Sequence, residues 1–156
     1  EGEAMSRYAE NTSVSADKSR SEIERTLQRY GATGFMYGWE GSRAIIAFKM
    51  KNRQIRFMLE MPSRDEKQFW FTSGRNQKRS EAQAFAAWEQ ATRQRWRALA
   101  LAVKAKLEAV EAGIATFEQE FMAHVVLPNG QTVGEVMVPQ IAAAYETGTM
   151  PKLLTA

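Results

Sequence analysis

The stretch that decides the fold is residues 34–61, which read GFMYGWEGSRAIIAFKMKNRQIRFMLEM. Apolar residues alternate with polar or small ones in three runs, at 34–39, 43–50 and 53–61. The short polar turns 40–42 and 51–52 separate the runs. Period-two alternation broken by tight turns is typical of antiparallel strands with one buried face. We therefore predict a three-stranded antiparallel meander whose apolar side needs a cover.

A long helix is the predicted cover. Within residues 80–112 the large apolar side chains recur at helical spacing and form one stripe. They are Phe85, Trp88, Trp96, Leu99, Val103, Leu107 and Val110.

Two shorter helices are predicted around this core. Ser19 or Ser21 begins the first, because each is followed three residues later by a glutamate, the capping-box spacing. Thr132 begins the last by the same rule, and Pro139 favours a late start that places the proline in the first turn. The expected class is α+β, with an N-terminal helix, the meander, a long helix on the sheet and a short C-terminal helix.

The domain organisation follows from composition. Residues 1–18 are polar and without helical periodicity, so we expect a flexible leader, followed by a single domain over 19–156. Residues 63–80 form a long polar connection interrupted by Phe69, Trp70 and Phe71. Connections of this length without their own structure are uncommon and often functional.

The charge of the chain is concentrated in its middle. The net charge is +3, yet residues 41–80 contain ten Lys and Arg against three acids, a local charge of +7. A concentrated positive field attracts polyanions or acidic protein surfaces. This pattern indicates a binding surface.

The candidate binding residues lie on the predicted sheet and in the connection after it. Arg43, Lys49 and Arg56 fall on the sheet face opposite the apolar set, and the connection adds cations beside aromatic rings. Cations neutralise phosphates and rings stack on bases, so this mixture suits a polynucleotide. The alternative is a solvated sheet face and a loop anchored by its aromatics. The candidates are Arg43, Lys49, Arg56, Trp70, Arg75, Lys78 and Arg79.

Catalytic and metal chemistry has little support. The chain has no cysteine and one histidine, His124, four residues after Glu120. One imidazole and one carboxylate on a helix face do not make a catalytic metal site. We expect no catalytic residue, no metal and no cofactor, and we rank last an enzyme using Glu111, Glu118, Glu120 and His124.

The long helix has a second basic set. Arg93, Arg97 and Lys104 lie within about 40° of one another around the axis, and Glu108 and Glu111 continue the ridge with opposite sign. This order opposes the helix dipole. A homodimer through antiparallel long helices would pair the two signs.

Three stretches carry a resemblance to a known group. They are residues 29–41, 95–113 and 127–135, which include GFMYGWEG, RWRAL and LPNGQTVGE. They resemble small uncharacterised proteins encoded in bacteriophages and prophages. The resemblance implies a cytoplasmic setting in a bacterial host and a phage role, and it carries no catalytic residue.

These observations lead to two functional hypotheses. The first is a non-enzymatic phage or prophage accessory protein that binds nucleic acid through the basic sheet face and loop. The second is a phage inhibitor or modulator that binds an acidic host protein, such as a defence or replication factor. No apolar run approaches the ~20 residues of a membrane span, so we expect no membrane partner.

Overall fold

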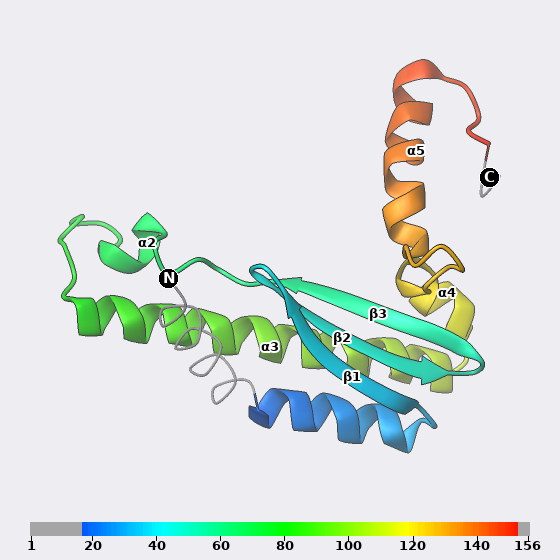
Figure 1. The fold of residues 1–156 in the computed structure, drawn as a ribbon, viewed down its shortest axis with the longest axis horizontal. Helices are drawn as coiled ribbons and strands as arrows, with labels where there is room; N and C mark the ends of the chain where they lie inside the picture. Colours follow the sequence, from blue (N-terminus) through cyan, green and yellow to red (C-terminus); the bar gives the residue numbers. More distant parts are fainter. Residues whose placement is uncertain (1–16, 153–156) are drawn as a thin grey trace.

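The computed structural model describes residues 17–152 and has the predicted α+β architecture (Figure 1). A helix, α1 (residues 17–29), precedes a three-stranded sheet, and a long helix follows it. The remaining elements in chain order are β1 (Thr33–Glu40), β2 (Arg43–Met50), β3 (Arg53–Glu60), α2 (Lys67–Trp70), α3 (Glu81–Glu111), α4 (Phe117–Phe121), the 3₁₀ helix η1 (Met122–His124) and α5 (Val133–Thr147).

The sheet is the predicted antiparallel meander in the order β1-β2-β3. Lys51 and Asn52, which join β2 to β3, both have positive φ, the geometry of a tight two-residue hairpin turn. The register pairs Ile46 with Phe57 and Phe48 with Ile55, so the inward residues of both strands align. One face of the sheet is therefore continuously apolar.

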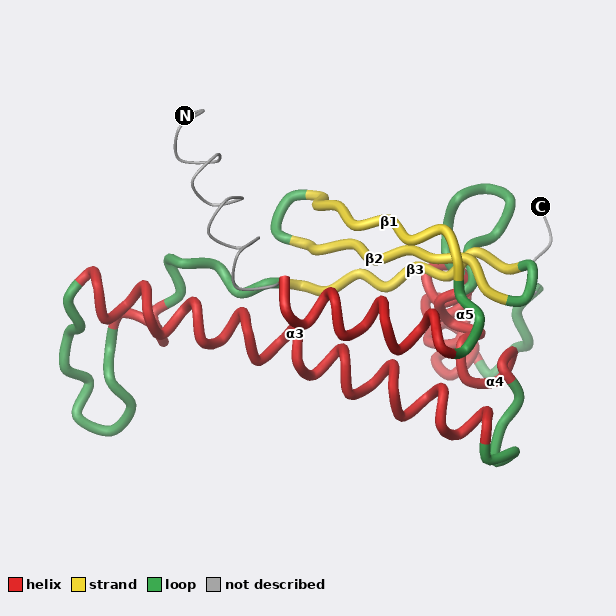
Figure 2. Tube along the Cα trace, turned by 90° about the horizontal axis from the view of Figure 1, so that it is seen from below, coloured by secondary structure: helices red, strands yellow, loops and turns green. Residues whose placement is uncertain are grey.

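Helices α1 and α3 cover most of that apolar face, and Phe121 of α4 packs edge-on against Phe48 and Phe57. α1 and α3 run side by side beneath the sheet (Figure 2). Leu27 of α1, Leu107 of α3 and Ile55 of β3 are all fully buried in one core cluster. Burying each such side chain contributes about 1.5–3 kcal/mol, so this layer is the main source of stability.

The start of α1 differs from the prediction. Residues 17 and 18 are already helical, so neither Ser19 nor Ser21 begins the helix, and the predicted leader is too long by two residues. An ion pair between Asp17 and Arg20, one turn apart, supports the first turn. The rest of the leader, residues 1–16, lies outside the described residues.

The connection 61–80 is structured, contrary to the expectation of a loop. It contains α2, and a β-bridge between Phe71 and Lys78 closes a small hairpin. α3 extends beyond the sheet, and its Trp88 needs another cover there. The connection supplies it: Phe69 is buried, and the Trp88 indole nitrogen donates to the Pro62 carbonyl at 2.8 Å.

The C-terminal part begins at the edge of the sheet and then leaves it. Val125 bridges to Ile55, and the Val126 amide donates to Gln54 O at 2.8 Å. α5 begins at the predicted capping box of Thr132 and Glu135. The expected late start is wrong, because this cap starts the helix well before Pro139 and leaves the proline inside it. Pro139 has no N–H, so α5 lacks the backbone hydrogen bond that this residue would donate to the Glu135 carbonyl.

Among residues 17–152, none of the helices combines the length and the apolar character needed to cross a bilayer.

Candidate nucleic-acid interface

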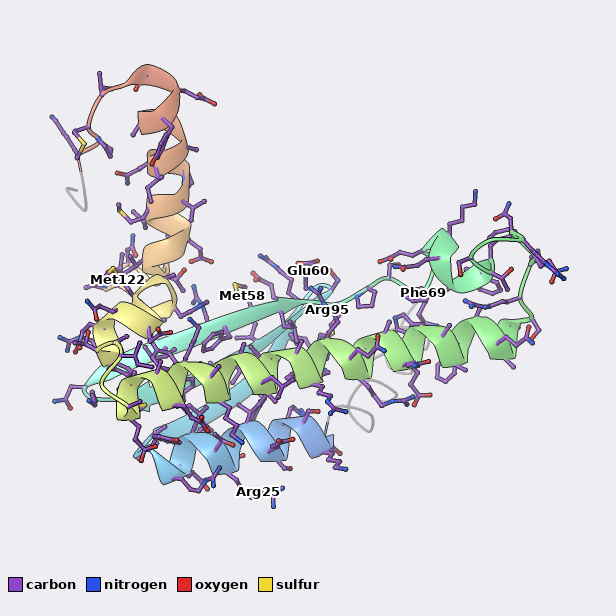
Figure 3. All side chains as sticks on the ribbon, turned by 180° about the vertical axis from the view of Figure 1, so that it is seen from behind. Arg25, Met58, Glu60, Phe69, Arg95 and Met122 are labelled. Carbon is purple, nitrogen blue, oxygen red and sulfur yellow. The ribbon has the colours of Figure 1, made fainter. Side chains whose placement is uncertain are left out.

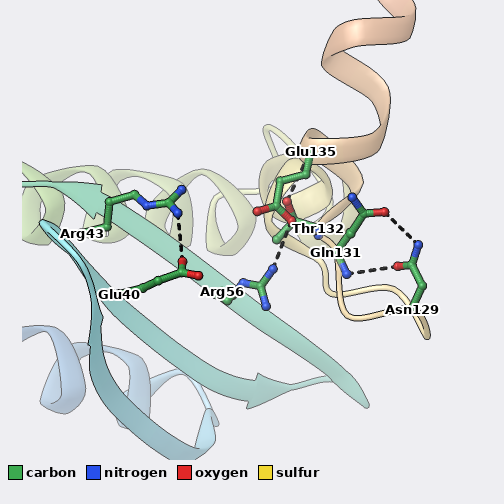
Figure 4. A network of polar contacts seen from close by, with 7 residues as sticks. All are labelled: Glu40, Arg43, Arg56, Asn129, Gln131, Thr132 and Glu135. Carbon is green, nitrogen blue, oxygen red and sulfur yellow. Dashed lines mark hydrogen bonds and ion pairs between the residues drawn. The ribbon is translucent and has the colours of Figure 1, made fainter.

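The three sheet cations lie on the outer face, as predicted, but two of them are paired with acids. Arg43 donates to Glu40 at 2.9 Å, and Arg56 donates to Glu135 of α5 at 3.1 Å (Figure 4). Lys49 is exposed and forms no ion pair with a described residue. Exposed pairs contribute only about 0–1 kcal/mol, but they cancel the local field.

The middle of this outer face is apolar. Ile45 pairs across the strands with Gly38 on one side and Met58 on the other, and Met36 lies opposite Ala47. Arg56 lies mid-strand opposite Ala47 and is paired with Glu135, and the other charged residues of this face lie toward the ends of the strands. The outer face therefore does not form the continuous cationic surface that the alternation predicted.

Arg56 has a structural partner in the cap of α5. The Thr132 amide donates to the Glu135 carboxylate at 2.7 Å, and this hydrogen bond, with a smaller contribution from Arg56, lowers the pKa of Glu135 (Figure 4). The carboxylate thus remains ionised and holds the Arg56 guanidinium. Arg56 ties α5 to β3.

The candidates in the connection divide into two kinds. Arg75 and Lys78 are exposed on the small hairpin, without an ion pair to a described residue. Arg79 instead donates to the Gln68 and Phe69 carbonyls at 3.1 and 3.3 Å, and the half-buried Trp70 donates its indole N–H to Arg64 O at 3.0 Å. Arg79 and Trp70 therefore hold the connection together, and two of the four side chains are free for a ligand.

A larger cationic surface lies along the groove between α1 and α3. It is formed by two adjoining hollows of about 640 and 590 Å³ that share Glu22. We call this surface the α1–α3 groove. Its cations are Lys18, Arg25, Arg29, Arg93, Arg97 and Lys104, against the single acid Glu22.

Most groove cations are unpaired within residues 17–152. Arg93 alone forms an ion pair, with Glu89 of its own helix at 3.4 Å. The Arg25 guanidinium donates to the Ser21 carbonyl, and in Figure 3 its side chain projects away from the body of the molecule. The other acids of α1 are engaged elsewhere: Asp17 pairs with Arg20, and Glu24 accepts from Tyr37. The groove consequently keeps a net positive charge.

The α1 half of the groove was missed although the sequence contains its signal. Lys18, Arg25 and Arg29 are spaced by seven and four residues, which places them within about 40° of one another on a helix. The α3 cations were recognised as a ridge. The sequence does not show that α1 and α3 run side by side and in the same direction, which joins the two sets (Figure 2).

The histidine and carboxylates stay apart from this surface. His124 stacks on Phe57 with ring centroids 4.1 Å apart, and burial, followed by the nearby Lys106 charge, lowers its pKa. Glu120 pairs with Lys106 at 3.5 Å. Within residues 17–152, no three His, Asp or Glu side chains are grouped as a metal site requires.

Comparisons with family models, with curated proteins and with solved structures found no match for this chain.

Proposed function

We propose that this protein binds nucleic acid without catalysis, by holding the phosphate backbone along the α1–α3 groove. The observation that carries the proposal is a groove lined by six cations and one acid, with five of the cations free of ion pairs inside the described chain. In the phage setting that the resemblance implies, it would act as an accessory factor in the bacterial cytoplasm.

The arrangement of the groove suits a backbone better than a small ligand. Its cations are spread along two helices, from Lys18 and Arg93 to Arg29 and Lys104, and the groove is open along its length. A linear polyanion can meet several such charges in succession and releases a counterion at each one. The segment 71–80, which carries the exposed Arg75 and Lys78, leads into the N-terminal end of α3 (Figure 1) and offers a further contact. The paired Arg43 and Arg56 are outside the proposed surface.

The salt dependence of binding tests the proposal. Anisotropy of a labelled DNA duplex and of a labelled single strand is measured for the wild-type chain and for the variant Arg25→Gln, Arg29→Gln, Lys104→Gln. Each phosphate contact contributes about 0.9 to the slope of log K against log salt on a duplex, so this variant should lower the slope by about 2 to 3. Its affinity at low salt should fall at least ~10-fold.

The matched control removes the same charge from the sheet. The variant Arg43→Gln, Lys49→Gln, Arg53→Gln should bind within about 2-fold of wild type if position matters more than net charge. An equal loss of affinity in both variants would overturn the assignment of the binding site to the α1–α3 groove. A second outcome would favour the host-protein hypothesis. In it, the wild-type chain binds neither the duplex nor the single strand at low salt, but captures an acidic protein from nuclease-treated host lysate.

A further inference from the structure

The C-terminal helix α5 is held to the described part of its own chain chiefly at its first turn. None of its residues is buried, and the 3₁₀ helix η1 is the element that it chiefly contacts, at its first turn. Figure 1 shows α5 leading away from the sheet beyond β3. Isolated helices of this length are marginally stable in water, so α5 needs a surface to pack on.

One side of α5 is apolar along its length. Met137, Ile141 and Tyr145 recur every four residues, and Val138 lies beside them. Val138 is 65% exposed, Ile141 47% and Tyr145 89%. Large apolar side chains clustered on one exposed side mark an interaction surface.

The same chain carries a second uncovered apolar surface. On the outer face of the sheet, Met36 is 54% exposed, and Ile45 and Met58 are half-buried beside it. Gly38, cross-strand to Ile45, leaves open space above the sheet, because an added Cβ would meet no atom within 4 Å. These residues form a shallow apolar surface, which we call the outer sheet patch (Met36, Gly38, Ile45 and Met58).

We infer that α5 of one molecule packs on the outer sheet patch of a second copy, and that the exchange is reciprocal. Because α5 leads away from its own sheet, the outer sheet patch on which it packs belongs to a second copy. α5 is about 22 Å long, and an eight-residue strand is about 26 Å long, so the helix can lie along the sheet face that contains the patch. A two-fold dimer would cover both surfaces twice.

The charges of the two surfaces are complementary at one end. α5 carries no Lys or Arg, and of its two acids Glu135 is paired with Arg56 of its own chain, while Glu146 forms no ion pair with a described residue. The end of the sheet at the β2–β3 turn carries Lys49, Lys51 and Arg53 and no acid, whereas at the other end Arg43 lies beside Glu40 and Glu60. The cationic end is thus the one that matches Glu146. Dimerisation through antiparallel α3 helices, the prediction made from the sequence, would instead cover Arg93, Arg97 and Lys104 of the α1–α3 groove.

The mass of the particle in solution tests the inference. Light scattering after size exclusion should give a dimer for wild type and monomers for two variants, Ile141→Glu with Tyr145→Glu on α5, and Met36→Glu with Met58→Glu on the patch. Mixed together, these variants should form a heterodimer, because one helix and one patch remain intact. Ile114→Glu, at an exposed apolar residue elsewhere, should stay dimeric.

Disulfide trapping keeps the inference testable if a glutamate variant fails to fold. The chain has no cysteine, so Ile141→Cys combined with Met36→Cys introduces the only thiols. Mild oxidation should link two copies into one covalent dimer, whereas Ile114→Cys with Met36→Cys should not. Monomeric wild type at about 100 µM, where weak dimers of micromolar affinity are populated, would overturn the inference. So would a dimer that survives the patch variant, because α5 would then pair with another surface, or a monomer that captures a foreign protein through α5.

Discussion

Gly134 shows how one residue holds α5 to the body of the protein. A Cβ built at this position would lie 2.9 Å from the carbonyl oxygen of Ala123, closer than real Cβ contacts allow. The first turn of α5 can therefore approach η1 only because residue 134 lacks a side chain. Helix propensity alone would favour alanine here by about 1 kcal/mol, so close packing outweighs propensity.

We expect Gly134→Ala to lower the free energy of unfolding by about 1–3 kcal/mol, the usual cost of overpacking a contact that cannot relax. Urea denaturation measures it. Gly38→Ala is the control, because nothing lies within 4 Å of its added Cβ, and it should change the stability by less than about 0.5 kcal/mol. If Gly134→Ala left the free energy of unfolding unchanged, η1 and α5 would have to separate easily.

His124 makes the stability depend on pH in a defined direction. Its folded-state pKa is lowered, chiefly by burial, while the unfolded chain titrates near the ordinary value of 6.5. The unfolded state therefore takes up the proton more readily, and stability falls as the pH drops below about 6.5. As the one histidine of the chain, His124 gives an unambiguous NMR titration.

The expected result is a melting temperature that decreases between pH 7 and pH 5.5 in the wild-type chain. His124→Phe, which preserves the stacking on Phe57, should show a weaker decrease over this range. A measured His124 pKa at or above 6.5 would contradict the assignment.

At the scale of elements, the connection 61–80 behaves as a small lobe seated on α3. Phe69 is buried, the Trp88 indole reaches Pro62, and the Arg64 guanidinium lies 4.8 Å from the Phe85 ring centroid and 5.5 Å from that of Trp88. These contacts cover the part of α3 that has no sheet above it. Figure 3 shows Phe69 at this end of the helix.

We expect Phe69→Ala to cost about 3 kcal/mol, as for other buried phenylalanines. The half-exposed Phe71 is the control, and Phe71→Ala should cost about half as much or less because it loses less buried surface. Urea unfolding followed by tryptophan fluorescence compares the two. Equal effects would show that Phe69 does not anchor the lobe.

The elements that the sequence predicted well are those with a strong local period. The alternation of residues 34–61 and the stripe of α3 specify the sheet, the long helix and their facing sides, because either pattern suits only one structure. The lobe at 61–80 could not be predicted, since its anchors Pro62 and Trp88 are far apart in the chain. Ion pairing of the candidate cations could be predicted only in part. Counting charges pointed to residues 41–80, and Glu40, which pairs with Arg43, lies only three residues away, but Glu135, which pairs with Arg56, lies far along the chain.

At the scale of the whole molecule, burial is uneven. The core between the sheet and the helices contains most of the fully buried side chains, Trp88 is buried under the connection 61–80, and α5 contains none. Local opening requires little free energy where few apolar contacts are broken.

We therefore expect α5 amides to exchange with deuterium far faster than those of α3 in dilute solution. At high protein concentration α5 should become protected as copies associate. Exchange followed by mass spectrometry over a range of concentrations measures both. Protection of α5 equal to that of α3 in dilute solution would contradict the uneven distribution of stability.

The residues after η1 also affect how the sheet can meet other strands. Val125 bridges to Ile55 and the Val126 amide donates to Gln54 O, which covers the start of the β3 border and leaves its second half without a strand partner among residues 17–152. The opposite border, at β1, also has no strand partner among these residues and is irregular between Thr33 and Met36. Fibril growth by strand addition needs two long, regular borders on every unit. With one border covered at its start and the other uneven, neither side of the sheet offers the full-length regular border that repeated strand addition needs.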